Sequence, residues 1–261
     1  MKNKTATRNA NPVSAKRTVA EHTTETPRFP HPVTLAVDIG GSGLKVMALD
    51  VNGKPLTERL RTPTPDPATP ERMLAALEEM RRQMPPCDRV SVGFPGVVKH
   101  GKTLTAVNLN PRWIGFPLES TLQRHWNMPV RLANDAAVQG YGAIRGHGVE
   151  MVLTVGTGLG SALFTDGHLC PGLEFGHHPW RKGKTYEDYL GRRGLERLGK
   201  RKWNRKLAKA IEQTALTFNW DHLYIGGGNA KLIDFKLPEH VTIISNEDGL
   251  FGGVALWRFQ D

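Results

Sequence analysis

The chain has 261 residues, of which 39% are hydrophobic and 23% charged, and its 35 Lys and Arg against 25 Asp and Glu give a formal net charge of +10. No stretch approaches the roughly 20 apolar residues of a membrane helix, and the N-terminus lacks the apolar run of a secretory signal. The length allows one large domain or two small lobes with a real core. The positive charge favours an anionic partner, but it does not choose between nucleic acid, a membrane surface and an anionic substrate.

Residues 1–32 are polar, rich in Lys, Arg, Thr, Asn and Pro, and almost devoid of core-forming side chains. We expect a disordered basic extension here, or in part a vector-derived leader. The two cysteines, Cys87 and Cys170, lie far apart and match no metal or redox spacing. This pattern predicts a protein without a disulfide framework, in a reducing cytoplasm.

Hydrophobic periodicity divides the rest of the chain into alternating strands and helices. In the first half, strands are expected at residues 33–38, 44–50, 89–92 and 130–132, helices at 71–83, 118–126 and 135–145, and a proline-rich extended loop at 62–70. In the second half, strands are expected at 151–155, 162–165, 223–225 and 241–244, and helices at 195–218 and 250–258. Strands that end in glycine loops and alternate with helices indicate an α/β protein.

A strand followed by a glycine turn occurs twice, near Gly40 and again near Gly156. Two similar halves that face each other across a central cleft would explain this repetition. We therefore expect an N-terminal lobe over residues 33–134 and a C-terminal lobe over 135–248. A final helix over 249–261 is expected to return to the N-terminal lobe.

The first glycine-rich segment reads Asp38-Ile-Gly-Gly-Ser-Gly-Leu-Lys45. Glycines after a strand let the backbone approach a phosphate closely, and the free N–H groups of the turn form an anion nest. The candidate phosphate-binding residues are Asp38, Gly40, Gly41, Ser42, Gly43 and Lys45. Asp38 could also hold Mg²⁺ through water. The segment lacks the ending of a Walker loop, and a plain glycine-rich hairpin is the alternative.

The second glycine-rich segment, Gly156-Thr-Gly-Leu-Gly-Ser161, repeats this chemistry. Its candidate phosphate-binding residues are Gly156, Thr157, Gly158 and Gly160. The segment superficially matches a dinucleotide fingerprint. However, the residues that follow it read as a strand rather than a helix, which argues against a Rossmann site.

Asn134 and Asp135 stand at the expected junction of the two lobes, between a strand and a helix. A kinase needs a carboxylate that positions the acceptor hydroxyl and takes its proton, and Asp135 could supply it. An Asp at the start of a helix is equally suited to cap it, so the capping role is the alternative.

The segment Glu174-Phe-Gly-His177-His178 combines a carboxylate with nearby imidazoles. Planar groups that form two hydrogen bonds recognise sugar hydroxyls well, so Glu174 and His177 are candidate sugar ligands. A zinc site is the competing interpretation, but the two adjacent histidines have no cysteine nearby.

Together, the order and spacing of these four motifs resemble the ROK family of sugar kinases, which have the two-lobed actin-like ATPase (RNase H-like) fold with a cleft between the lobes. The resemblance covers residues 33–257. It implies that Asp135 is the catalytic base and that Asn134, Glu174 and His177 bind the hexose. It also implies that the segments Gly93-Phe-Pro-Gly96 and Asn110-Pro-Arg-Trp113 line the sugar pocket. Gly226, Gly227 and Gly228 match a loop near the adenosine of a nucleotide donor.

The chain departs from typical ROK members after Glu174–His177, where a cysteine-rich cluster normally binds zinc and where this chain has no cysteine. The resemblance therefore implies no bound metal at His177, and it places Glu187 at another hexose-binding position. The zinc-free pattern is similar to the polyphosphate glucokinases. It implies a cytoplasmic, homodimeric enzyme that uses Mg²⁺ and transfers phosphate from polyphosphate or ATP to the 6-hydroxyl of glucose. The alternatives are an ATP-dependent ROK hexokinase acting on glucose or mannose, and a sugar-responsive ROK repressor.

Residues 181–206 concentrate the positive charge of the chain. We expect a basic track for a long donor there, with Lys184, Lys200 and Arg201 among its residues; a solvated helix face is the alternative. A nucleic-acid partner is not expected, because the basic helical part of the segment, residues 195–206, has no interleaved stacking aromatics beyond Trp203. The polar N-terminal residues also have too few apolar side chains for a DNA-binding helical module, which argues against the repressor.

Overall fold

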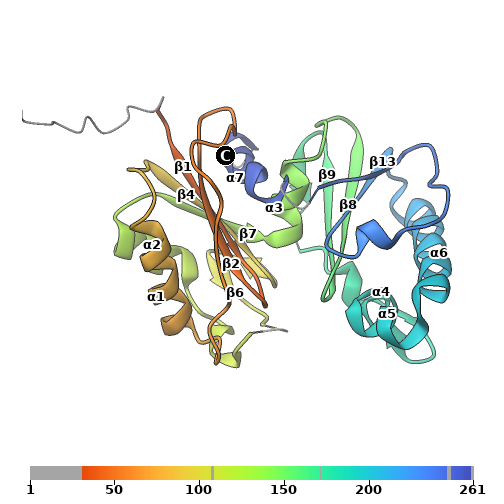
Figure 1. Ribbon diagram of the computed structural model, residues 1–261. Helices are drawn as coiled ribbons and strands as arrows, with labels where there is room; N and C mark the ends of the chain where they lie inside the picture. The colour runs from red at the N-terminus through yellow and green to blue at the C-terminus, as the bar shows by residue number, and fades with distance from the viewer. Residues whose placement is uncertain (1–30, 107–108, 171, 246–247, 260–261) are drawn as a thin grey trace, which may run out of the picture.

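The computed structural model describes residues 31–106, 109–170, 172–245 and 248–259. Residues 1–30 of the extension predicted over 1–32 therefore lie outside the described residues. Two five-stranded sheets stand side by side, each with helices on its outer face, and a pair of helices lies between them (Figure 1). This arrangement confirms the predicted α/β class. No helix in the described ranges is long and apolar enough to cross a bilayer.

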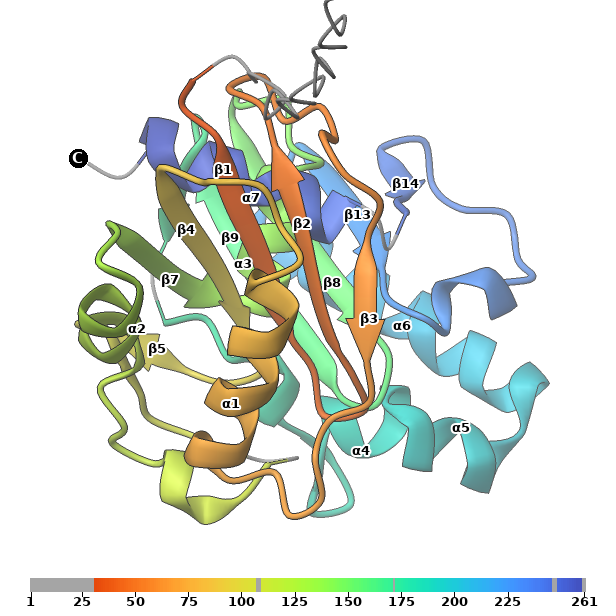
Figure 2. The ribbon, with the colours of Figure 1, turned by 60° about the vertical axis from the view of Figure 1, so that its left-hand side comes forward.

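The first sheet has the strand order β3-β2-β1-β4-β7. Its strands are β1 (Thr34–Ile39), β2 (Leu44–Leu49), β3 (Leu60–Thr62), β4 (Arg89–Phe94) and β7 (Val130–Asn134). Helices α1 (Pro70–Arg81) and α2 (Leu118–Trp126) cover its outer face, as Figure 2 shows. The short elements β5 (Val98–Lys99), β6 (Lys102–Thr103) and η1 (Pro111–Trp113) form the connection from β4 to α2.

The second sheet repeats this topology in the order β10-β9-β8-β13-β14. Its strands are β8 (Val149–Val155), β9 (Leu159–Thr165), β10 (His168–Cys170), β13 (His222–Gly226) and β14 (Val241–Ile243). In the first sheet β1 pairs antiparallel with β2 and parallel with β4. In the second sheet β8 pairs in the same way with β9 and β13. Each antiparallel pair is joined by one of the two glycine turns, so both turns lie at the same end of equivalent sheets.

Several elements follow β10 and lead to the outer face of the second sheet. They are η2 (Phe175–His177), β11 (Pro179–Arg181), β12 (Lys184–Thr185), α4 (Tyr186–Leu190), α5 (Arg192–Leu198) and α6 (Lys200–Phe218), with η3 (Ala230–Leu232) between β13 and β14. The central helix α6 buries Trp203, Leu207 and Ile211 against this sheet.

Helices α3 (Asp135–Tyr141) and α7 (Asp248–Phe259) lie between the two sheets. Strand β1 shows how the sheet serves two cores, because successive side chains point to opposite faces. Leu35 and Val37 join the core under α1 and α2, while Ala36 packs against Leu250 and Val254 of α7. The last helix thus contacts the first sheet, whereas the exact lobe boundaries at 134/135 and 248/249 stay predictions.

Three expected elements differ in the structure. The helix predicted over 195–218 is two helices, because Gly199 has φ +72° between α5 and α6, a conformation that interrupts helical hydrogen bonding. The helix predicted over 135–145 ends at Tyr141, before the two glycines Gly146 and Gly148. The loop predicted over 62–70 is shorter at both ends, because Thr62 is the last residue of β3 and Pro70 is the first residue of α1. Thr69 caps that helix.

Candidate functional site

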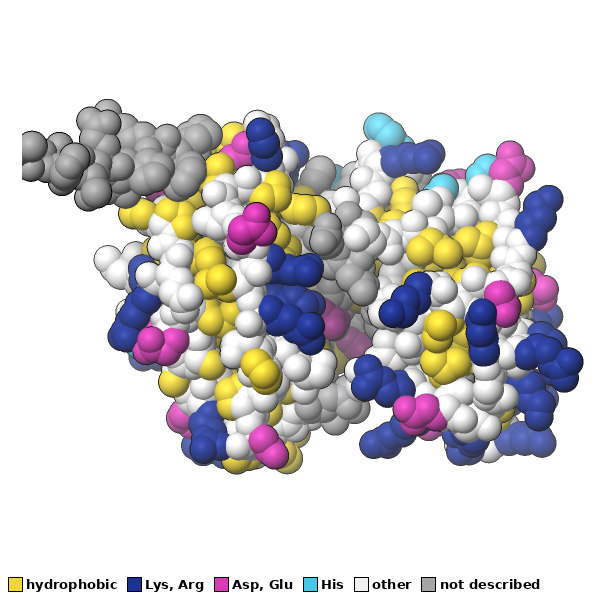
Figure 3. Space-filling model, in the orientation of Figure 1, with side chains coloured by type: hydrophobic (Ala, Val, Ile, Leu, Met, Phe, Trp, Pro, Cys, Tyr) yellow, Lys and Arg dark blue, Asp and Glu magenta, His cyan; other side chains and the backbone are white. Residues whose placement is uncertain are grey.

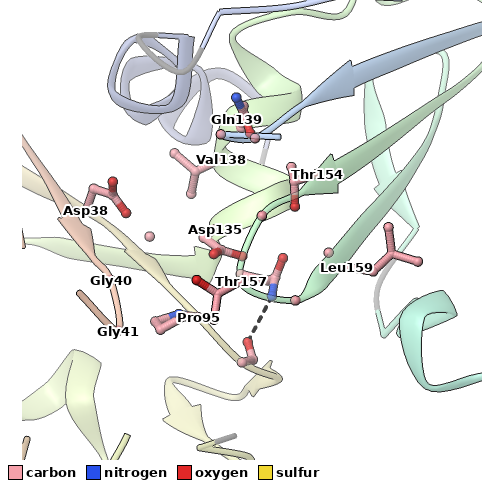
Figure 4. Close-up of a pocket in the computed structure, with 18 of the residues that line it drawn as sticks. Asp38, Gly40, Gly41, Pro95, Asp135, Val138, Gln139, Thr154, Thr157 and Leu159 are labelled. Atoms are coloured by element: carbon pink, nitrogen blue, oxygen red, sulfur yellow. Dashed lines mark hydrogen bonds between the residues drawn. The ribbon is translucent and has the colours of Figure 1, made fainter. Parts of the chain in front are cut away.

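A cleft with a volume of about 310 Å³ opens between the two sheets. This volume lies at the lower end of the range for small-ligand pockets, roughly 300–1,000 Å³. The predicted site residues that line it are Asp38, Gly40, Gly41, Ser42, Lys45, Gly96, Asn134, Asp135, Gly156, Thr157, Gly158, Gly160, Glu174, His177, Glu187, Gly227 and Gly228. Asp38, Asp135 and Thr157, which come from three different elements, point into the same space (Figure 4).

Asp135 is the first residue of α3, directly after β7. Its pKa is raised to about 7, first by burial and then by the negative charges of Asp38 and Glu174. The N–H of Ala136, at 2.7 Å from Oδ1, and the ammonium of Lys45 act in the opposite direction. A carboxyl group with a pKa near neutrality in a cleft is suited to exchange protons with a ligand.

The N-cap of α3 is Asn134, whose Oδ1 accepts a hydrogen bond of 2.9 Å from the N–H of Ala136. The alternative role of Asp135 as the helix cap is therefore wrong, because the preceding residue occupies that position. The Asn134 amide also donates a hydrogen bond of 3.1 Å to the carbonyl of Gly96, across the parallel pair β4–β7. These two bonds fix the Asn134 side chain and leave one N–H and one lone pair for a ligand.

The first glycine turn connects β1 to β2 and is closed by a 3.0 Å hydrogen bond from the N–H of Gly40 to the carbonyl of Gly43. Asp38 and Lys45 face each other directly in the antiparallel register, and the Lys45 ammonium lies 2.6 Å from Asp38 Oδ2. A Cβ on Gly40 would approach the Gly43 carbonyl to 2.8 Å, so the narrow turn needs glycine there. The ion pair places one cation and one carboxylate at the edge of the cleft.

The second glycine turn connects β8 to β9 in the same way, with a 3.0 Å hydrogen bond from the N–H of Gly156 to the carbonyl of Gly158. Glu187 braces this turn, because its Oε2 accepts a 2.9 Å hydrogen bond from the N–H of Leu159. A Cβ on Gly158 would lie only 2.4 Å from the same oxygen. The glycine therefore allows the Glu187 carboxylate to reach the turn.

Glu174, His177 and Glu187 form an acidic and imidazole wall opposite the first turn. His177 Nδ1 lies 4.0 Å from Glu174 Oε2. Burial raises the pKa of Glu174; His177 lowers it and Glu187 raises it. Helix α4 holds Glu187 in place through a capping box between Thr185 and Asp188. The expected position of Glu187 beside the other sugar candidates thus agrees with the geometry of the cleft.

Six predicted residues do not line the cleft: Gly43, Asn110, Gly226, Lys184, Lys200 and Arg201. Asn110 instead caps η1 by accepting a 3.0 Å hydrogen bond from the N–H of Arg112. Gly226 packs against the side chain of Gln139 at the end of β13. The Lys200 ammonium lies 3.4 Å from a carboxylate oxygen of Asp234 on the outer surface.

Gly93, Pro95 and Leu159 of the predicted segments also line the cleft, and the structure adds lining residues that the motifs did not include, namely Thr105, Val138, Gln139 and Thr154. Val138 and Gln139 stand three and four positions after Asp135, which puts them on the same face of α3. That spacing was a usable signal in the sequence. Thr105 carried no such signal, because its place in the cleft depends on the loop after β4, where its Oγ1 accepts a 2.9 Å hydrogen bond from the N–H of Val97.

Within the described ranges, no group of three or more His, Cys, Asp or Glu side chains is arranged to hold a metal ion. His177 and His178 are both exposed, and Cys87 and Cys170 are separate free thiols. The absence of bound zinc nevertheless stays a prediction, which metal analysis of the purified protein tests.

The repeated sheets, the two facing glycine turns and the cleft between them define a two-lobed protein of the actin-like ATPase fold. Residues 34–194 match the ROK family, and the chain belongs to this family.

Its curated relatives include the polyphosphate glucokinase of Mycobacterium tuberculosis H37Rv, which is 31% identical over 236 residues, 83% of this chain and 88% of that protein. The polyphosphate glucokinase of Mycobacterium leprae is 30% identical, over 90% of this chain and 81% of that protein. Among solved structures, the inorganic polyphosphate/ATP-glucomannokinase of Arthrobacter sp. strain KM superposes with a TM-score of 0.78 at 30% identity, over 85% of this chain and 97% of that one. A ROK glucokinase of Streptomyces griseus has a TM-score of 0.74 at 21% identity over 86% of this chain and 98% of that one, a likeness of fold.

Proposed function

We propose that this protein is a glucokinase that transfers a phosphoryl group from inorganic polyphosphate, or from ATP, to the 6-hydroxyl of glucose. The observation that carries the proposal is Asp135, a carboxyl group with a pKa raised to about 7 between two glycine turns and a wall of sugar-type ligands. The names of the relatives at 30–31% identity support the same activity. They favour a kinase over the sugar-responsive repressor.

In this proposal Asp135 is the general base. Phosphoryl transfer depends mostly on positioning and on electrostatic stabilisation, because the transition state is loose. The 6-hydroxyl of the sugar donates its proton to the Asp135 carboxylate as its oxygen attacks the terminal phosphorus, and the bond to the leaving phosphate oxygen breaks. A base whose pKa lies near the working pH is both ionised often enough and basic enough for this step.

Sugar recognition is assigned to Glu174, Glu187, His177 and Asn134. The two carboxylates accept hydrogen bonds from sugar hydroxyls, and the free N–H of Asn134 donates one. Because Glu187 also braces the Gly158–Leu159 backbone, it ties the position of the sugar to the position of the second turn. This coupling places the acceptor hydroxyl against the donor phosphate.

The donor phosphates are assigned to the two glycine turns, with Lys45 supplying a positive charge and Gly227 and Gly228 extending the second side of the cleft. Asp38 is the residue for Mg²⁺, since carboxylate oxygens are its preferred protein ligands and Asp38 keeps one oxygen free of Lys45. Mg²⁺ held there together with the donor would neutralise negative charge on the phosphates. The Mg²⁺ requirement, the homodimer and the cytoplasmic location stay predictions.

Incubation of the purified protein with glucose, MgCl₂ and either long-chain polyphosphate or ATP tests the proposal. We expect glucose 6-phosphate with both donors and a higher kcat/KM with polyphosphate. Product with ATP alone, with mannose accepted as well, would support the ATP-dependent hexokinase instead. The proposal is wrong if neither donor gives a sugar phosphate.

Glu174→Gln should raise the KM for glucose by about 5- to 150-fold, since a buried polar contact that is lost or mismatched costs roughly 1–3 kcal/mol. The KM for the donor should stay within about twofold. Glu196→Gln, an exposed carboxylate on α5 in the same lobe, is the matched control and should leave both constants unchanged. Equal increases in both KM values would contradict the assignment of Glu174 to the sugar.

A further inference from the structure

Four cations gather where the β11–β12 hairpin meets α6, outside the cleft. Arg181 and Lys182 belong to the hairpin, and Arg205 and Lys206 to the helix; we call these four the α6 cluster. Three of them are exposed, and Lys206 is half-buried. Lys and Arg side chains crowd the lower and outer parts of the lobe that contains α4, α5 and α6 (Figure 3).

Lys206 is held at the centre of the α6 cluster by two aromatic rings. Its ammonium lies 5.8 Å from the ring centroid of Trp180 and 5.7 Å from that of Tyr189. Both distances are within the range of cation–π attraction. The pKa of Lys206 is lowered, first by burial and then by the charges of Arg181, Arg205 and Lys182. The rings therefore hold a lysine in a place where three other cations repel it.

The α6 cluster has no ion-pair partner among the described acidic residues, in contrast to two other lysines of α6. Lys200 pairs with Asp234, and Lys209 pairs with Glu212. None of the four cluster side chains forms a salt bridge with an acidic residue in the described part of the chain. Like charges held together without a counter-charge destabilise the fold, and an anionic ligand would relieve that repulsion.

Helix α4 separates the α6 cluster from the cleft. Glu187 contacts the second glycine turn inside the cleft, whereas Tyr189, two positions later and on the opposite side of the helix, contacts Lys206. The α6 cluster and the cleft are therefore separated by the thickness of one helix, about 10 Å. Arg192 and Arg193, which follow α4 in the chain, are both exposed. The N–H of Arg192 donates a 3.2 Å hydrogen bond to the carbonyl of Thr157 in the second glycine turn.

We propose that the α6 cluster is an anchoring site for the distal phosphates of a polyphosphate chain whose terminal phosphates occupy the cleft. This inference rests on the proposed function. Two exposed cations connect the turn with the cluster: the N–H of Arg192 bonds to Thr157, and the Arg197 guanidinium lies 5.5 Å from the centroid of the Tyr189 ring that Lys206 also contacts. This arrangement suits a flexible polyanion. Inorganic tripolyphosphate and ATP end within or near the cleft and do not reach the cluster. The basic track predicted over residues 181–206 is thereby assigned to four of its cations, at residues 181, 182, 205 and 206.

The test compares the double variant Lys182→Gln/Lys206→Gln with the control Arg124→Gln/Lys209→Gln. The control removes the same charge from exposed positions on α2 and on the next turn of α6, where Lys209 already pairs with Glu212. KM is measured for long-chain polyphosphate, tripolyphosphate and ATP at one salt concentration. Binding of labelled long-chain polyphosphate without glucose is measured in parallel over a range of salt.

In the cluster variant, the KM and the Kd for long-chain polyphosphate should rise by about 2- to 30-fold, the effect of losing two charge contacts at the protein surface. The slope of log Kd against log salt should fall by about one for each cation removed, by analogy with nucleic-acid binding. Constants for tripolyphosphate and ATP should stay within about twofold, and the control should match the native protein.

Equal losses with all three donors, or no loss with any, would overturn the anchoring site. Duplex DNA that binds the native protein as tightly as polyphosphate, with the same loss in the cluster variant, would overturn it in favour of a nucleic-acid surface. The binding measurement separates this inference from the proposed function. A native protein that binds polyphosphate through the cluster but makes no glucose 6-phosphate refutes the proposed function and leaves the anchoring site standing.

Discussion

Asp135→Asn should lower kcat by about 10²- to 10⁴-fold, the usual contribution of a positioned general base. The amide keeps the shape of the side chain but cannot accept the proton of the sugar hydroxyl. The KM for glucose should change little, because Asn134, Glu174, Glu187 and His177 remain. Steady-state kinetics with saturating donor measures both constants.

The pH profile gives this prediction a second readout. Asp135 must be ionised to accept a proton, and its pKa in the free protein is raised to about 7. Native kcat/KM should therefore fall as the pH drops below about 7, by close to tenfold per pH unit. The residual activity of Asp135→Asn should lack this acidic limb. A limb that persists in the variant would belong to another group and would contradict the assignment.

Although Asp135→Asn should lower activity, it should raise the stability of the protein at high pH. A carboxyl group whose pKa is raised on folding favours the native state below its unfolded pKa, near 3.8, and this contribution is lost as the pH rises through about 7. Above pH 7 the native protein carries a buried charge near Asp38 and Glu174, and asparagine removes it. The Tm of Asp135→Asn should therefore exceed the native Tm at pH 8 and approach it at pH 5. A variant with low activity and a lowered Tm at pH 8 would have lost its fold rather than its base.

The sequence was sufficient to predict what depends on local spacing. Alternating apolar residues predicted β1. Apolar residues four positions apart, Leu118 and Leu122, predicted α2 at its observed bounds. The glycine turns were also predictable, because close backbone contacts there require glycine, as the 2.4 Å approach at Gly158 illustrates. Motif order then identified most of the residues that line the cleft.

Long-range packing set the limits of that prediction. Short elements such as α4 and the β11–β12 hairpin have too few residues for a periodic pattern, yet they decide where Glu187 and Lys206 lie. The charge-rich stretch 181–206 reads as one basic segment in the sequence. Only the fold separates Lys200, paired with Asp234, from Lys206, which is surrounded by cations and rings. The structure was also needed to exclude the alternative capping role of Asp135, because Asn134 and Asp135 are equally good N-cap residues and Asn134 occupies the cap position.

The contact between α3 and α7 leaves no room for a side chain at Gly252, so a single added methyl group should destabilise the fold. A Cβ at Gly252 would lie 1.7 Å from the carbonyl oxygen of Val138 and 2.8 Å from the N–H of Gly142. Both atoms belong to the backbone, so no side-chain rotation relieves the clash, and the two helices must move apart. Val138 lies one turn after Asp135 and lines the cleft. A shift of α3 would therefore also displace the Asp135 carboxyl group.

Gly252→Ala should lower the free energy of unfolding by about 1–3 kcal/mol, the usual cost of overpacking, and lower the Tm by roughly 2–10 °C. The sign is diagnostic, because alanine in place of glycine in a helix otherwise stabilises by about 1 kcal/mol. Ala255→Gly in the same helix gives the scale of helix propensity alone and should leave kcat near the native value, whereas Gly252→Ala should lower kcat as well. Denaturant unfolding and steady-state kinetics on both variants decide the matter. A Gly252→Ala protein that is more stable than the native one and equally active would show that α7 does not pack this closely on α3. In that case α7 would not be what holds α3 and Asp135 in place.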